Sequence, residues 1–364
     1  MIRKLLRSSH KIKNDSGIII IIVLWAMVIL TTLVVSLGRN TSIELSLTKY
    51  ALGDLKAKYL AWAGLNFAMN QIKIDSDDQL SNSFDNLYYC AISSSQEDST
   101  EQLFKHKELG QGYFDIRYVY KGSSGAQKLD FYGMQDEERK ININTLNNVA
   151  ILNSLLEILG VDATTAQTIS YSILDWKDAD KDLSQNNFGA EDEYYTGQTP
   201  SYHCKNAPFD SLEELLLVRG MTKEIYSKVK DYLTVFPKDG PFVINFNTAS
   251  KTVLQSVARW GISQSPTNDV ADADSLVDNI LRYRAGDDLE DGTKDDRSIN
   301  VGQFGLGLNA KEGFLFSVIS QMGNEKSNYI RVSVLGVDNA SHVKVPIEAV
   351  IRRDDFAIID WRRF

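Results

Sequence analysis

The sequence predicts an α+β fold in which a long amino-terminal helix packs on an antiparallel sheet, with a large all-helical domain inserted between strands of that sheet. Three observations predict it: an apolar run near the amino terminus, strand-like runs before residue 141 and after residue 310, and helical periodicity between them. At 364 residues, the chain is long enough for two or more domains with separate cores.

The apolar run covers residues 18–37 and contains no charge, proline or glycine. As a helix, a run of this length matches a hydrocarbon core roughly 30 Å thick. Residues 1–17 hold five basic side chains against one acid, a net charge of +4. By the positive-inside rule, this basic leader stays in the cytoplasm and everything after the run faces outward. The run is longer than that of a secretory signal peptide, and no small-residue cleavage site follows it.

The membrane helix is expected to continue past the apolar run. Apolar residues recur at intervals of three and four, which predicts an amphipathic stripe that covers the sheet. The stripe consists of Ile43, Leu47, Ala51, Leu55, Tyr59, Trp62, Leu65 and Met69. Residues 38–140 are therefore interpreted as the rest of this helix and the first strands.

Period-two alternation predicts the strands of the sheet. Residues 112–120 alternate between apolar or aromatic side chains and polar ones. Near the carboxy terminus, strand-like runs separated by turn-prone residues cover 316–321, 329–337, 343–352 and 356–361. Residues 311–364 are therefore expected to be antiparallel strands.

The middle of the chain, residues 141–310, follows helical periodicity instead. Helices are expected over 149–159, 163–174, 211–218, 223–235 and 275–284. A weak internal repeat is also present. Residues 142–145 (NINT) are echoed by 245–248 (NFNT), and 173–176 (ILDW) by 280–283 (ILRY). Asparagine and threonine suit helix starts because their side chains accept hydrogen bonds from the first free amides.

Composition argues against an enzyme and against a nucleic-acid-binding protein. Without the leader, the net charge moves from −9 to −13, which repels phosphates and favours cations and basic partners. His10, His106, His203 and His342 lack the spacing of zinc ligands, and no Gly-rich phosphate loop occurs. Cys90 and Cys204 are too few for a disulfide framework, so they either pair with each other or are two buried thiols.

Two acidic runs are candidate cation sites. The first holds Asp175, Asp178, Asp180, Asp182, Glu191, Asp192 and Glu193. Such a loop can bind Ca²⁺ through carboxylate oxygens, although it lacks the glycine and glutamate of an EF-hand; the alternative is a solvated acidic loop. The second run holds Asp287, Asp288, Glu290, Asp291, Asp295 and Asp296 and is expected to be solvated.

A charged leader ending in glycine, directly followed by an apolar helix, resembles type IV pilins and the pseudopilins of type II secretion systems. Five further segments resemble the K-type minor pseudopilin, namely DEERKININT, ILDWKDAD, GAEDEYY, KNAPFDSLEELLLVRGM and INFNTAS. This resemblance covers nearly the whole chain.

The resemblance implies that a prepilin peptidase cuts after Gly17, leaving Ile18 as a methylated amino terminus. It implies a single span in the bacterial inner membrane and a body in the periplasm. It also implies a role in protein export at the pseudopilus tip, with I-type and J-type minor pseudopilins, other pseudopilins and the inner-membrane secretion platform as partners. Calcium in the helical domain is implied as well, with Asp178, Asp180, Glu191 and Asp192 as ligands and Asp182 and Glu193 as further candidates.

Ile22 stands where most such subunits carry a glutamate that neutralises the amino terminus of a neighbouring subunit. A subunit without this carboxylate suits the tip, because the first subunit has no predecessor to neutralise. Two alternatives stay open: a pilin-like subunit for DNA uptake, suggested by a helix-hairpin-helix-like segment at 212–229, and a monotopic cell-surface binding module that is never cut.

Overall fold

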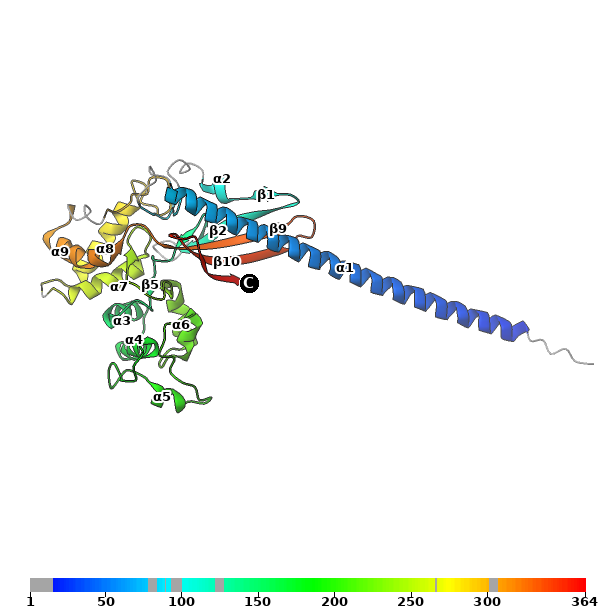
Figure 1. Cartoon of the computed structure of the whole chain (residues 1–364), viewed down its shortest axis with the longest axis horizontal. Coiled ribbons are helices and arrows are strands. Elements are labelled where there is room, and N and C mark those ends of the chain that lie inside the picture. The colour runs from blue at the N-terminus through cyan, green and yellow to red at the C-terminus, as the bar shows by residue number, and fades with distance from the viewer. Residues whose placement is uncertain are drawn as a thin grey trace, which may run out of the picture.

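The computed structural model describes residues 16–77, 84–88, 90–92, 100–121, 128–265, 267–300 and 307–364, so most of the predicted leader lies outside the described residues. The predicted α+β fold is confirmed. Helix α1 (Ser16–Asp77) is continuous over 62 residues, a length of about 93 Å at 1.5 Å per residue. Its amino-terminal part projects away from the body, and its carboxy-terminal part lies on a sheet (Figure 1).

Among the described residues, α1 is the one helix long and apolar enough to cross a membrane. Its most apolar window has a mean hydropathy of 3.1, and none of that window is buried within the chain. Large aliphatic side chains are exposed on every side of this segment, from Ile18 to Leu37. Such a surface is stable only in lipid or against other apolar helices.

The sheet is antiparallel, and its strands come from both ends of the body. Strand β2 (Gly112–Lys121) lies beside β9 (Tyr329–Asp338), with Ile116 opposite Val334. The remaining strands are β1 (Lys107–Leu109), β3 (Lys128–Tyr132), β4 (Gln135–Asp136), β10 (Lys344–Arg352) and β11 (Ile358–Arg363), and the main path runs β1-β2-β9-β10-β11. The short helix α2 (Thr100–Phe104) precedes β1. Two distant segments therefore form one sheet, and what lies between them is an insertion.

Small residues, and not the predicted stripe of large ones, bring α1 close to the sheet. The backbone of α1 at Gly64 packs so closely on β9 that a Cβ there would lie 2.4 Å from Val334 Cγ1. On β9, a Cβ at Gly336 would lie 2.1 Å from the Ala57 carbonyl oxygen. Leu55 and Tyr59 of the predicted stripe are 47% and 67% exposed, so that prediction was wrong for them. Apolar spacing indicates a helix with an apolar face, but close backbone approach selects the small-residue face for the sheet.

The insertion is mainly helical. Its elements are β5 (Ile141–Asn142), α3 (Val149–Ile158), α4 (Ala163–Lys177), α5 (Asp192–Thr196), the 3-10 helix η2 (Leu212–Leu217), α6 (Lys223–Val229), the 3-10 helix η3 (Lys230–Tyr232), β6 (Leu233–Thr234), β7 (Ile244–Asn245), α7 (Lys251–Ile262), α8 (Val270–Arg284), α9 (Ala310–Ile319), the 3-10 helix η5 (Ser320–Met322) and β8 (Gly323–Asn324). In Figure 1, α8 and α9 lie past the carboxy-terminal end of α1, whereas α3 to α6 lie to the side of the sheet, below α1 in this view.

Three predicted elements differ from the structure. Residues 316–321 were predicted as a strand, but they belong to α9 and η5, so the carboxy-terminal segment does not begin with strands at 311. Asn309 caps α9 together with Glu312, and the helix buries Leu315 and Ile319. A capping box favours a helix over a strand even for a short apolar run. Residues 211–218 form a 3-10 helix, and the helix predicted over 223–235 ends at Val229.

The two echoed motifs have the same local structure. Strand β5 pairs in parallel with β6, and β7 pairs in parallel with β8. Lys177 Nζ, at the end of α4, donates to the carbonyl oxygens of Ile143 and Leu146. Arg284 Nη1, at the end of α8, donates to the carbonyl oxygens of Phe246 and Ala249. In each copy, a cation at a helix end therefore binds the carbonyls of the preceding Asn-x-Asn-Thr turn.

Three successive carboxylates join the sheet to the insertion. Each accepts a hydrogen bond from a different segment of it: Asp136 from Thr248, Glu137 from Thr234 and Glu138 from Asn324. Arg331 of β9 pairs with Glu137, and both side chains are largely buried. The segment DEERKININT therefore holds both copies of the helical unit on the sheet.

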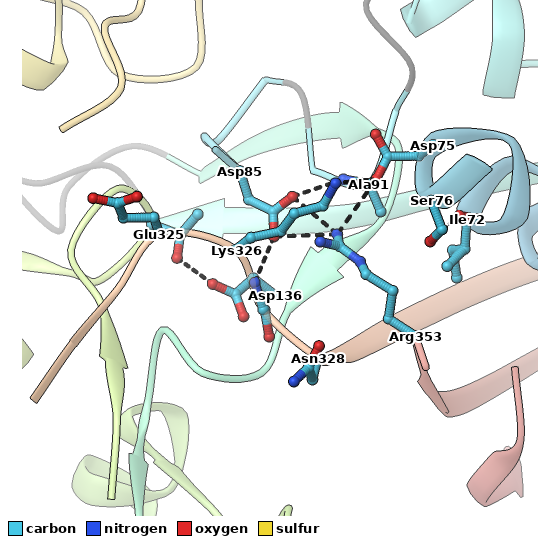
Figure 2. A network of polar contacts seen from close by, with 12 residues as sticks. Ile72, Asp75, Ser76, Asp85, Ala91, Asp136, Glu325, Lys326, Asn328 and Arg353 are labelled. Atoms are coloured by element: carbon cyan, nitrogen blue, oxygen red, sulfur yellow. Dashed lines mark hydrogen bonds and ion pairs between the residues drawn. The ribbon is translucent and has the colours of Figure 1, made fainter. Parts of the chain in front are cut away.

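A second buried network ties the end of α1 to the same region (Figure 2). Asp85 accepts the Ser327 N–H at 2.8 Å and pairs with the Arg353 guanidinium at 2.9 Å. Lys326 pairs with Asp75 of α1 at 3.1 Å. Asp75 and Asp85 lie far from Lys326 and Arg353 in the sequence. These contacts therefore fix the position at which the insertion leaves the sheet.

Candidate functional site

The first acidic run follows α4 and ends where α5 begins, at the end of the insertion away from α1 (Figure 1). Asp178 is the residue that caps the carboxy-terminal end of α4, and Glu191 stands just before α5. The carboxy-terminal end of a helix carries partial negative charge, so carboxylates placed there are unfavourable without a cation. The loop between α4 and α5 brings the carboxylates of Asp178 and Glu191 close together.

Three carboxylates converge. Oxygens of Asp178, Asp180 and Glu191 all lie within 4.8 Å of one another. Asp178 Oδ1 and both carboxylate oxygens of Glu191 are buried, and no N–H or O–H group donates to them. Buried oxygens without donors are costly, and their cost disappears when a cation binds. An all-oxygen set of this kind suits a hard cation such as Ca²⁺.

The pKa values of two of these carboxylates are raised, which also favours a bound cation. Burial, followed by repulsion from Asp175 and Asp178, raises the pKa of Glu191 to about 7. Burial, followed by repulsion from Asp180 and Asp175, raises the pKa of Asp178 to about 6. The nearby Lys177 compensates only weakly, because its Nζ donates to carbonyl oxygens of the preceding turn. The cluster therefore holds its protons tightly unless a cation replaces them.

Asp175 shapes the loop without joining the cluster. It is fully buried, its Oδ1 accepts the Ser184 N–H at 2.9 Å, and its Oδ2 accepts the Ala190 N–H at 2.7 Å. Gly189 packs so closely on this carboxylate that a Cβ there would lie 2.1 Å from Oδ2. Asp175 therefore closes the loop and sets the distance between Asp178 and Glu191.

The other three predicted ligands lie outside the cluster. Asp192 Oδ1 accepts the Cys204 N–H at 2.8 Å, and this contact is the main reason that the pKa of Asp192 is lowered. Asp182 and Glu193 are exposed. Successive residues at the start of α5 point to different sides of the helix, so Asp192 and Glu193 cannot face the same point as Glu191.

Sequence reasoning missed Asn206. Its Nδ2 donates to the Asp180 carbonyl oxygen at 2.9 Å, and its Oδ1 is buried without a donor. Its backbone is left-handed, with φ of 47°, a conformation that asparagine tolerates. A position near 206 could not be tied to the acidic loop from spacing alone, because 26 residues separate it from Asp180.

The second acidic run is satisfied by the chain itself. Thr293 Oγ1 donates to Asp295 at 2.6 Å, and the Asp287 N–H donates to the same carboxylate at 2.7 Å. Asp291 pairs with the buried Arg284 at 3.3 Å. The remaining contacts are the pair of Asp287 with Arg297, the Glu290 N–H to Asp288, and the Gly292 and Thr293 N–H groups to Asp296. Each of these acids except Glu290 thus has a hydrogen-bond or ion-pair partner within the described part of the chain, although burial raises the pKa of Asp296 to about 7.

Contacts in the hairpin oppose phosphate binding there. Asp162 caps α4, and its carboxylate accepts the Thr165 N–H at 3.0 Å, so a negative charge already occupies the amide end of this helix. Arg219 donates to the Gly189 carbonyl oxygen at 2.8 Å and stacks on Tyr194, with 5.1 Å from its guanidinium carbon to the ring centre. Both features of the DNA-binding alternative are therefore engaged inside the fold.

The two cysteines do not pair. Cys90 and Cys204 are free, buried thiols. Cys90 belongs to the core between α1 and the sheet, and Cys204 belongs to the core of the insertion. Of the two alternatives, buried thiols are the one that the structure shows.

Comparisons with known proteins match the first part of the insertion. The family "Type II secretion system (T2SS), protein K" matches residues 139–238. Type II secretion system protein K of Aeromonas hydrophila is 36% identical over 100 residues, which are 28% of this chain and 30% of the relative. Its counterpart in Pseudomonas aeruginosa is 29% identical over 148 residues, 38% of this chain and 43% of the relative.

The putative protein K of Escherichia coli (strain K12) is 27% identical over 165 residues, 42% of this chain and 48% of the relative. The aligned part of the chain thus spans between 30% and 48% of the length of these three curated relatives. Sequence similarity is therefore concentrated in one part of each protein.

Structural similarity extends further. A chain of the crystal structure of the GspK-GspI-GspJ complex from enterotoxigenic Escherichia coli has a TM-score of 0.55. The match has 16% sequence identity and covers 89% of this chain and 98% of that one. The fold is thus shared over nearly the whole length. Together with the family match over residues 139–238, this shared fold confirms the resemblance to protein K of type II secretion systems that the sequence predicts.

Proposed function

We propose that this chain is a minor pseudopilin that stands at the tip of the pseudopilus of a type II secretion system. In this role it assembles with I-type and J-type minor pseudopilins, helps to start the assembly, and serves protein export across the outer membrane. It is a structural subunit and not an enzyme. The observation that carries the proposal is the combination of an exposed membrane helix, a pilin-type sheet and a family-K insertion in one chain.

The position of the insertion supports the tip. Its helices α8 and α9 lie past the carboxy-terminal end of α1, away from the exposed apolar segment, and α3 to α6 extend to the side of the sheet (Figure 1). Subunits of a filament stack along the direction of such a helix, so the insertion occupies the space of a subunit above. Ile22 supports the same position, because it offers no carboxylate to a preceding subunit.

Processing and location follow from the amino terminus. We infer cleavage by a prepilin peptidase between Gly17 and Ile18, methylation of Ile18, and retention of α1 as a single span of the inner membrane. The body then lies in the periplasm, where it also meets other pseudopilins and the inner-membrane secretion platform.

A bound Ca²⁺ completes the insertion in this proposal. Asp178, Asp180 and Glu191 would supply its carboxylate oxygens, and their buried orphan oxygens are the observation that supports it. The ion would remove the repulsion among these acids and hold α4 against α5. Asp182, Asp192 and Glu193 would not contact the ion directly.

The test is the mature amino terminus together with its partners. Mass spectrometry of the chain purified from its own membranes should find a methylated Ile18 at the start, and I-type and J-type subunits should copurify. Gly17→Leu should block cutting, whereas Gly38→Leu is a matched control, since a Cβ meets nothing within 4 Å at either position. An uncut wild-type chain without partners would instead support a monotopic binding module.

A further inference from the structure

The three successive carboxylates where the sheet meets the insertion differ in whether a cation compensates them. Glu137 pairs with Arg331 of β9 and with Lys140, so its charge is compensated. Asp136 and Glu138, on either side of it, are 1% and 5% exposed, and neither pairs with a basic side chain within the described residues. We name Asp136 and Glu138 the uncompensated carboxylates.

Neutral groups are what the described residues offer to the uncompensated carboxylates. The donors are hydroxyl groups, a side-chain amide and backbone N–H groups: Thr248, Ser327 and the Glu138 N–H at 2.7 Å for Asp136, and Asn324 and the Asn328 N–H at 3.3 Å for Glu138. A buried negative charge that meets neutral donors and no cation is costly. Each of these two side chains therefore favours its protonated form.

The cations near this pair are engaged by other acids. Figure 2 shows Arg353 between Asp85 and Asp75, whose oxygens lie 2.9 Å and 3.8 Å from its Nη2. Lys326 pairs with Asp75 at 3.1 Å. The charged and titratable groups around the uncompensated carboxylates are Asp75, Asp85, Cys90, Glu137, Arg139, Lys140, Glu325, Lys326, Arg331 and Arg353.

The pKa values follow this difference in partners. Burial, followed by repulsion from Asp85, raises the pKa of Asp136 from 3.8 to about 6. Burial, followed by repulsion from Asp136, raises the pKa of Glu138 from 4.5 to about 7. Burial acts in the same direction on Glu137, but attraction from Arg331 and Lys140 outweighs it and lowers the pKa of that carboxyl. Near neutral pH, the outer two carboxylates therefore change charge, whereas the middle one stays ionised.

The uncompensated carboxylates hold one of the two helical units. Residues 244–324, from β7 to β8, form the second unit, and residues 141–234, from β5 to β6, form the first. Asp136 and Glu138 accept hydrogen bonds from Thr248 and Asn324 of the second unit. Glu137 accepts its hydrogen bond from Thr234 of the first unit. A change of charge at the outer two carboxylates therefore acts on the attachment of the second unit.

We propose that the second helical unit is attached to the sheet by a proton-dependent joint, which is firm while Asp136 and Glu138 carry protons and loosens when they ionise. The inference goes beyond the proposed function and does not rest on it. The attached form binds both protons more tightly than the unfolded chain. Their contribution to stability is therefore present at low pH and is lost as the pH rises through about 6 to 7.

Hydrogen exchange of the full chain in detergent, read by mass spectrometry at pH 6 and pH 8, tests the joint. The protection of α7 and α8 is divided by that of β10 in the same molecule, which cancels the intrinsic dependence of exchange on pH. This ratio should fall by about tenfold from pH 6 to pH 8, because Glu138 alone loses its proton over this range. In the double variant Asp136→Asn, Glu138→Gln, the ratio should stay at its value at pH 6.

Two matched variants separate the joint from other acids. Burial also raises the pKa of Asp296, within the second unit, to about 7. Asp296→Asn should nevertheless keep most of the fall. Glu157→Gln, at an exposed position of α3, should keep all of it. A constant ratio in the wild-type chain would overturn the proposal, and so would a fall that persists in the double variant but disappears in Asp296→Asn.

The proposal stays testable if the double variant does not fold, which lost protection of β10 would reveal. Glu138→Gln alone then decides. With Asp136 as the remaining uncompensated carboxylate, the fall between pH 6 and pH 8 should shrink from about tenfold to about twofold, because Asp136 is already half ionised at pH 6. An unchanged tenfold fall in this single variant would contradict the joint.

Discussion

The two acidic loops of the insertion follow equivalent helices and have nearly the same composition. They differ in whether their carboxylates have hydrogen-bond donors or arginine partners. After α4, carboxylate oxygens of Asp178 and Glu191 are buried without donors. After α8, all acids except the exposed Glu290 accept hydrogen bonds or pair with arginine. The number of acids therefore does not separate the two loops; the buried carboxylate oxygens without donors do.

The difference begins at the residue that ends each helix. Lys177 and Arg284 both turn back to the carbonyls of their Asn-x-Asn-Thr turns. The other terminal nitrogen of the Arg284 guanidinium, Nη2, also donates to the Asp291 carboxylate. A lysine ammonium is a single point, whereas a guanidinium can bind carbonyls and a carboxylate together. The first loop therefore lacks the carboxylate–guanidinium pair of the second loop, although burial also raises the pKa of Asp296 in the second loop to about 7.

The largest expected effect separates these two helix ends. Arg284→Met should lower the free energy of unfolding by about 3–5 kcal/mol, because it removes the buried ion pair with Asp291 and the donor to two buried carbonyl oxygens. Lys177→Met should cost about 1–3 kcal/mol, since its ammonium is only partly buried. Denaturant unfolding of the full chain in detergent measures both, and an equal loss would contradict the comparison.

Calcium should stabilise the chain through the first loop alone. At a free concentration of 100 times Kd, the gain is about 2.7 kcal/mol for one site. Thermal unfolding of the chelator-treated chain, with and without added Ca²⁺, shows the gain as a rise in Tm. Glu191→Gln should abolish this rise, whereas Asp287→Asn, in the second loop, should leave it intact. Loss of the rise in both variants, or in neither, would count against a site at Glu191.

The effect of pH should have opposite signs with and without calcium. Burial raises the pKa of Glu191 from 4.5 to about 7, so the folded chain binds this proton more tightly than the unfolded chain. Without calcium, this contribution to stability is present at low pH and is lost as the pH rises through about 7.

Calcium competes with the same proton, so its affinity should rise by up to about tenfold between pH 6 and 7. Calorimetric titration of the chain at several pH values measures this rise. In Glu191→Gln the steep part of the pH dependence should disappear. An affinity that stays constant over this range would show that Glu191 does not bind the ion.

The smallest expected effect concerns the second loop. Arg297 and Asp287 form an exposed pair, with side chains 46% and 84% exposed. Arg297→Gln should therefore lower the free energy of unfolding by less than about 1 kcal/mol. The same denaturant measurement decides it, and a loss as large as that of Arg284→Met would mean that exposed pairs, and not the buried one, hold this loop.

Local patterns predicted much of the fold. Alternation located β2, β9, β10 and β11 to within a few residues, and the apolar run located the exposed apolar part of α1. The failures were at positions where two local signals compete. Residues 316–321 have the composition of a strand, yet the capping box of Asn309 and Glu312 starts a helix just before them.

The candidate site was predicted less completely. Asp178, Asp180 and Glu191 were among the six residues named, because the resemblance pointed to this acidic loop, whereas spacing alone left a solvated loop as the alternative. Which acids converge depends on the closure of the loop by Asp175 and Gly189, and on the segment that brings Asn206 beside it. These contacts join residues that are distant along the chain, so the spacing of residues in the sequence does not predict them.

The sequence by itself determined the long apolar helix, the strands and the acidic composition of the insertion, since each depends on the order of neighbouring side chains. Only the tertiary structure decided which face of α1 meets the sheet and which of two acidic loops lacks donors. The physical reason is the same for both. Close packing and hydrogen-bond satisfaction depend on atoms from distant segments, and such atoms become neighbours only after the chain has folded.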